Sequence, residues 1–63
     1  MFECRFTTDG AAFRDNDGDK DEFAEAEEIT SILVKMTRLI ADGSRGGAVM
    51  DTNGNKVGDW RIV

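Results

Sequence analysis

Carboxyl groups are the one chemically capable side-chain type that this sequence concentrates in a single stretch. Eight of the 13 acidic residues fall between Asp15 and Glu28, against the single base Lys20, so the stretch has net charge 1 − 8 = −7. The rest of the chain holds five acids and seven bases and sums to +2. Clustered carboxyl groups can imitate nucleic acid, hold a cation, or keep a small protein in solution. The eight are Asp15, Asp17, Asp19, Asp21, Glu22, Glu25, Glu27 and Glu28.

The spacing of these acids favours imitation of nucleic acid. If residues 15–20 are extended at about 3.3 Å per residue and the remainder is helical at about 1.5 Å per residue, the charges spread over about 30 Å. The resulting separation of about 4 Å per charge approaches the about 3.4 Å between phosphates along one DNA strand. Like-charged helix neighbours such as Glu22 and Glu25 are mutually destabilising, so local helix stability does not account for them. All eight acids are therefore predicted to bind a partner, a basic nucleic-acid-binding protein.

Calcium binding is the alternative use of the same residues. The run from Asp15 to Asp21 alternates carboxylates as a calcium loop does, and positions 1, 3 and 5 of such a loop fall on Asp17, Asp19 and Asp21. Position 12, which requires a bidentate ligand, then falls on Glu28. The match is incomplete because position 6, where a sharp turn requires glycine, is Glu22. A solvated acidic face that serves solubility or general protein interaction is also open.

The sequence lacks the residues that other kinds of catalytic or metal-binding site require. The chain has no histidine and no tyrosine, and its single cysteine, Cys4, alternates with two phenylalanines and is expected to point inward. Nucleophile pairs with histidine and the usual zinc sites therefore cannot be assembled. We expect no enzymatic activity and no cofactor, and the net charge of −5 argues against direct binding of nucleic acid.

Four segments position these residues. Residues 1–8 alternate apolar and polar side chains and predict a strand, and residues 9–18 predict an acidic loop in which only Phe13 can reach a core. A 3.6-residue period predicts a helix over residues 19–42, capped by Asp19 with Glu22 and stopped at Asp42-Gly43. Its apolar stripe is predicted to run through Phe23, Ala26, Ile29, Leu33, Met36 and Ile40, widened by Ile32 and Leu39.

Residues 48–63 predict a hairpin. Asn53-Gly54 favours a type I′ turn, and Val49, Trp60 and Ile62 are expected to face the helix. The order β-α-β-β predicts an α+β fold in one domain of residues 1–63, with a long amphipathic helix on a three-stranded antiparallel sheet whose third strand is central. The helix is longer than such strands, so its charged N-terminal end is expected to extend beyond the sheet.

The chain is short, and we expect a monomer or a weak homodimer. A single cysteine favours a reducing cytoplasm over a secreted disulfide scaffold. No apolar run approaches the roughly 20 residues of a membrane span, so no membrane association is expected.

The central helix and two further segments resemble a group of small uncharacterised proteins of bacteriophages and prophages. The segments are Phe6-Thr-Thr-Asp-Gly-Ala-Ala-Phe13 and Asp51-Thr-Asn-Gly-Asn-Lys-Val-Gly-Asp-Trp60. The resemblance implies a fold and a phage origin, and so the cytoplasm of a host bacterium. Small acidic phage proteins are similar in kind to anti-CRISPR proteins, some of which place carboxylates where DNA phosphates bind. We therefore expect a non-enzymatic inhibitor, an anti-CRISPR of the DNA-mimic type that acts on a subunit of a CRISPR-Cas surveillance complex.

Overall fold

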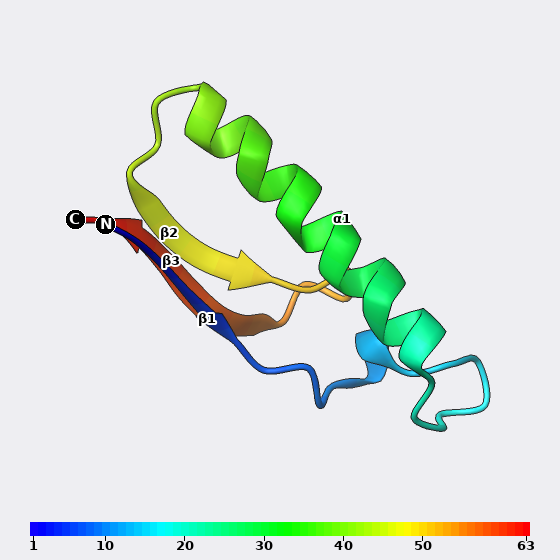
Figure 1. Ribbon diagram of the computed structural model, residues 1–63. Helices are drawn as coiled ribbons and strands as arrows, with labels where there is room; N and C mark the ends of the chain where they lie inside the picture. Colours follow the sequence, from blue (N-terminus) through cyan, green and yellow to red (C-terminus); the bar gives the residue numbers. More distant parts are fainter.

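One helix packs against one face of an antiparallel sheet in the computed structural model, which describes residues 1–63 (Figure 1). The elements are strand β1 (Phe2–Phe6), a 3-10 turn η1 (Ala11–Phe13), helix α1 (Glu22–Ala41), and strands β2 (Gly46–Met50) and β3 (Lys56–Ile62). The predicted α+β architecture is confirmed. None of the helices combines the length and the apolarity that crossing a bilayer requires.

The last strand of the chain is the middle strand of the sheet. The order is β1-β3-β2 and both pairs are antiparallel, as predicted. Cys4 lies opposite Trp60 on one side of β3, and Gly47 lies opposite Trp60 on the other. The ladder between β2 and β3 shifts register between Val49 and Met50 because β3 has one extra residue at Val57.

The core lies between α1 and the sheet. Its buried members are Phe13, Ile32, Met36, Val49 and Trp60, with Cys4, Phe6, Ala12, Ile29, Ile40, Val57 and Ile62 partly buried around them. The predicted inward positions of Val49 and Trp60 are confirmed. Phe2, which follows the same alternation as Cys4 and Phe6, is half exposed because it lies at the end of β1, and its ring lies 6.0 Å from that of Trp60.

The helix begins later than predicted. Asp21, rather than Asp19, is the N-cap: its side chain accepts a hydrogen bond from the backbone N–H of Phe23 at 3.0 Å. The predicted stop is confirmed, because Gly43 adopts a φ of 100° and its N–H donates to the carbonyl of Ile40 at 3.0 Å. A positive φ after the last turn is the usual role of glycine at a helix end.

The apolar stripe of the helix also differs from the prediction. The buried positions on α1 are Glu28, Ile32 and Met36, spaced by four residues, whereas Phe23 is 76% exposed and Leu33 44% exposed. The prediction for Phe23, Ala26 and Leu33 is wrong because the sequence contains two stripes with helical spacing, and only one can face the sheet. Leu39, predicted to widen the stripe, is 46% exposed as well.

The hairpin turn is not of type I′. No residue other than glycine has a positive φ, so Asn53 does not, and only Gly54 adopts one, at 82°. The N–H of Gly54 donates to the carbonyl of Asp51 at 3.0 Å, and the N–H of Asp51 donates to the carbonyl of Asn55 at 2.9 Å. These bonds enclose a three-residue loop of residues 52–54, the second commonest way to close a hairpin.

The N-terminal turns of α1 extend past the strands and lie over η1, as predicted for the charged end (Figure 1). Phe13, only 2% exposed, holds η1 to the core. This single aromatic side chain therefore connects the acidic part of the chain to the packed part.

Candidate partner-binding surface

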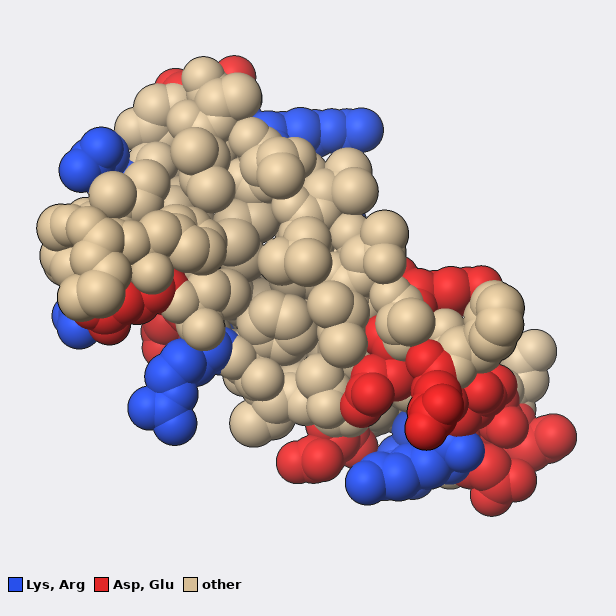
Figure 2. All heavy atoms as spheres, viewed as in Figure 1, with Lys and Arg blue, Asp and Glu red and all other residues tan.

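Seven of the eight predicted site residues are exposed or half-buried, at the end of the molecule where the loop of residues 15–21 meets the first turns of α1. Figure 2 shows acidic atoms gathered there, with a small basic area among them. Arg14 and Lys20 are the bases within this part of the chain. This acidic end comprises Asp15, Asp17, Asp19, Asp21, Glu22, Glu25 and Glu27.

The loop that carries the first four acids is folded tightly on itself. The carboxyl oxygen Oδ1 of Asp15 accepts the backbone N–H groups of Asp17 and Asp19, each at 2.9 Å. Asp15 N–H also donates to the carbonyl of Asp19 at 3.1 Å, and Arg14 pairs with Lys20 as an isolated β-bridge. The extended spacing predicted for residues 15–20 is therefore wrong, because local side-chain bonds of an aspartate close a turn. The acids form a compact cluster rather than a line.

The side chains of the acidic end divide by what they already bond. Asp15 closes the loop and Asp21 caps the helix. The other five carboxyl groups make no hydrogen bond or ion pair within the chain, and they belong to Asp17, Asp19, Glu22, Glu25 and Glu27. These five groups are free to meet a partner.

Glu28 does not belong to the exposed surface. It is 7% exposed and lies one helical turn before the buried Ile32. Its Oε2 accepts the backbone N–H of Thr52 at 3.1 Å, and its Oε1 accepts the hydroxyl of Thr52. The predicted partner-binding residue instead ties the middle of α1 to the hairpin turn. Its spacing from Ile32 and Met36 was the signal for this, but its charge grouped it with the neighbouring acids.

Asp51 is a second buried acid, one that the sequence did not single out. It is 4% exposed, and its Oδ1 accepts the N–H of Asn55 at 2.9 Å. An aspartate that bonds the backbone across a turn is a common turn device, and its place before Thr52-Asn53-Gly54 was the available signal. Asp51 and Glu28 thus both hold the hairpin turn, Glu28 through Thr52 and Asp51 through Asn55.

The predicted calcium ligands do not come together. No group of three or more acidic or cysteine side chains is placed so that it can hold a metal ion. Glu28, required at the last ligand position, is buried against Thr52, and Asp21 is occupied as the helix cap. The arrangement therefore does not fit a calcium loop, which needs about six converging oxygen ligands.

The acidic end is hollowed on one side. A depression of about 570 Å³ lies between the loop and the first turns of α1, lined among others by Arg14, Asp15, Asp21, Phe23 and Glu27. Such a notch with carboxyl groups on its walls suits a cationic side chain, because carboxylates form strong charge-assisted hydrogen bonds with guanidinium and ammonium groups.

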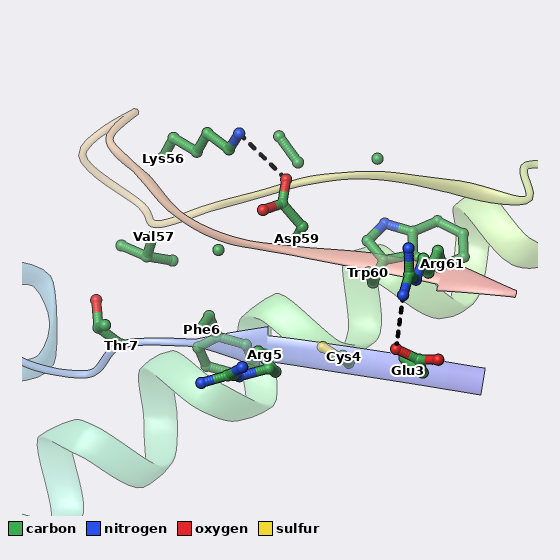
Figure 3. Close-up of a pocket in the computed structure, with 13 residues that line it drawn as sticks. Glu3, Cys4, Arg5, Phe6, Thr7, Lys56, Val57, Asp59, Trp60 and Arg61 are labelled. Atoms are coloured by element: carbon green, nitrogen blue, oxygen red, sulfur yellow. Dashed lines mark hydrogen bonds and ion pairs between the residues drawn. The ribbon is translucent and has the colours of Figure 1, made fainter. Parts of the chain in front are cut away.

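A larger hollow, of about 920 Å³, opens over the sheet face that α1 leaves uncovered (Figure 3). Its charged side chains are largely paired with one another: Lys56 with Asp59 at 3.1 Å and Arg61 with Glu3 at 3.2 Å. Cys4 lines the same hollow, and burial raises the pKa of its thiol, which favours the unreactive protonated form. Arg5 is the one charged side chain of the lining without an ion pair, so the hollow carries three bases against two acids, in contrast to the acidic end.

Comparison of the chain with protein-family models, with curated proteins and with solved structures found no match.

Proposed function

We propose that this chain is a non-enzymatic inhibitor whose acidic end occupies the phosphate-binding surface of a basic nucleic-acid-binding protein. The observation that carries the proposal is the separation of charge: seven exposed or half-buried acids gather at one end of a chain whose uncovered sheet face carries three bases and two acids. A concentrated field of one sign steers oppositely charged partners and competes with phosphates for the same basic groups.

The compact arrangement refines how the acidic end competes. A linear array would follow a DNA strand, whereas a folded loop beside a helix end presents a cluster with a notch of about 570 Å³. We propose that an arginine or lysine that otherwise contacts phosphate enters this notch, beside Asp15. Asp17, Asp19 and Glu22 then meet neighbouring bases, since none of the three is committed to a bond within the fold.

A DNA-binding subunit of a CRISPR-Cas surveillance complex is the target class that we propose first. It combines an extended basic channel for nucleic acid with the bacterial host that a phage protein meets. The support for this class is the acidic end together with the phage-type resemblance of the sequence.

The test is competition with DNA. The chain, immobilised, is incubated with a bacterial lysate, and the captured proteins are eluted with duplex DNA and identified. We expect a basic nucleic-acid-binding protein in the eluate and, with that protein purified, displacement of labelled DNA by the chain. A captured protein that duplex DNA does not release contradicts the proposal.

Two double variants with equal changes of charge make the competition specific. Reversal of Asp17 and Glu22 to lysine removes two free carboxyl groups from the acidic end and should weaken displacement by at least about tenfold, because close charge pairs contribute about 1.5 kcal/mol or more each. The matched control reverses Asp9 and Asp42, two exposed acids outside the acidic end, to lysine. This control should change the displacement of DNA little. Equal losses in the two double variants would mean that net charge, rather than the acidic end, governs binding.

A further inference from the structure

Helix α1 carries a second uncharged stripe, on the side that faces away from the sheet. All of its residues are exposed, and Phe23, Val34 and Leu33 are 76%, 45% and 44% exposed. Steps of three and four residues place them along one helix face about 100° wide, the width typical of a stripe that is covered. The stripe consists of Phe23, Ala26, Thr30, Leu33, Val34, Thr37 and Ala41.

The opposite side of the same helix already packs on the sheet through Ile32 and Met36. That buried side includes one acid, Glu28, which Thr52 bonds, whereas the outward stripe carries no charged residue. All three large side chains of the outward stripe are exposed: Phe23, Leu33 and Val34. A contiguous exposed surface of this kind marks an interaction site.

The charges beside the stripe are sorted along the helix. Glu22 and Glu27 border it in the N-terminal half, and Arg38 borders it in the C-terminal half. Glu25 and Lys35 lie further round the helix. Glu27 and Arg38 are 38 − 27 = 11 residues apart, close to three helical turns, so both border the same edge of the stripe. Each of them is exposed and neither forms an ion pair within the chain.

We propose that a second copy of this chain covers the stripe, with the two α1 helices antiparallel about a two-fold axis. A parallel arrangement would place acids against acids, whereas the antiparallel one places Glu27 beside Arg38 of the second copy, twice over. It also opposes the two helix dipoles. Near the axis, Thr30 lies beside Val34 of the second copy, and Phe23 reaches the turn that ends at Ala41 of the second copy. The small side chains Ala26 and Ala41 allow the close approach of packed helices, about 8–10 Å between axes.

The size of the contact sets its strength. The 20 residues of α1 span about 30 Å, and a strip about 10 Å wide gives roughly 300 Å² of contact footprint on each copy. That places the dimer in the small class of interfaces, for which weak association is typical. The free loop acids Asp17 and Asp19 lie outside the stripe, one pair at each end of the dimer, so the dimer does not rest on the proposed function.

Sedimentation equilibrium of the full chain tests the dimer, over concentrations from about 1 µM to about 1 mM, the range in which weak complexes form. We expect a monomer–dimer equilibrium within this range. Val34→Glu, which places like charges near the axis, should raise the dissociation constant at least tenfold, while circular dichroism shows the fold unchanged at this exposed position. A wild-type chain that remains monomeric at the highest concentration overturns the proposal.

A charge exchange tests the antiparallel direction. Glu27→Lys and Arg38→Glu should each weaken the dimer, and the double variant, whose net charge is again −5, should restore it, because the pair forms between copies. Arg5→Glu, on the uncovered sheet face and without an ion pair, makes the same charge change as Arg38→Glu and should leave the dimer nearly unchanged. Failure of the double variant to regain dimerisation overturns the antiparallel arrangement. A chain that dimerises in this way but does not compete with DNA leaves the dimer standing and removes the proposed function.

Discussion

The two halves of α1 are held in the fold by different kinds of contact. The C-terminal half packs on the sheet through Ile32 and Met36, two of the five buried hydrophobic residues. The N-terminal half extends beyond the strands, and its one buried side chain is an acid, Glu28. One half is held by apolar burial and the other by a few specific contacts, so stability and charge are separated along one element. A chain of this size can then keep repelling acids together, because they do not have to fit into the core.

Removal of the only core residue at the acidic end should give the largest effect. Phe13→Ala is expected to lower the free energy of unfolding by about 3–5 kcal/mol, since a fully buried phenylalanine leaves both a cavity and lost burial. Phe23→Ala, the same change at a 76% exposed position, should cost less than about 0.5 kcal/mol in the monomer. Urea unfolding at low protein concentration measures both. Equal costs for the two phenylalanines would mean that burial of Phe13 does not hold η1 and the acidic end to the core.

A smaller difference in stability is expected between two adjacent glutamates of α1, one buried and one exposed. Glu28→Ala leaves the backbone N–H and the hydroxyl of Thr52 without their partner and should cost about 1–3 kcal/mol. Glu27→Ala, the neighbouring and exposed change, should stay within about 0.5 kcal/mol. Thermal unfolding of the two variants reports the difference. A harmless loss of Glu28 would mean that the acidic half is not tied to the hairpin through this side chain.

The smallest expected effect concerns pH. Burial raises the pKa of the Cys4 thiol in the folded protein above that in the unfolded chain. Above the unfolded value the unfolded chain binds fewer protons, so this stability contribution is present at lower pH and is lost as pH rises through the folded value. The wild-type chain should therefore lose slightly more stability than Cys4→Ala in alkaline solution. Parallel unfolding curves for the two proteins across this range would contradict the shift.

The sequence predicted the parts of the fold that depend on periodicity and on single strong signals. The strand order, the central position of β3, the burial of Phe13 and the stop at Gly43 are all confirmed. It did not predict which of two helical stripes faces the sheet, because steps of three and four residues connect Met36 to Leu33 as well as to Ile32. That choice depends on where the helix lies on the sheet. The spacing of apolar residues within the helix carries no information about that position.

The sequence predicted most of the residues of the candidate site, but not how they are arranged in space. Asp15 folds the loop through its own side chain, so the acids gather instead of extending. Glu28 left the exposed set because Thr52, 24 residues away, supplies two donors to it. Contacts of this kind join segments that are remote in sequence, and neither charge nor local propensity encodes them.

Because β3 is the central strand, the sheet can form only late in the synthesis of the chain. Synthesis produces β1 first, yet β1 bonds only to β3, which follows the helix and β2. At the same end, the N–H of Val63 donates to the carbonyl of Met1 at 2.8 Å, across nearly the whole sequence. Contacts between remote segments form late and slowly. Until residues 56–62 have been made, neither β1 nor β2 has a strand to pair with, so the sheet cannot form before β3 is available.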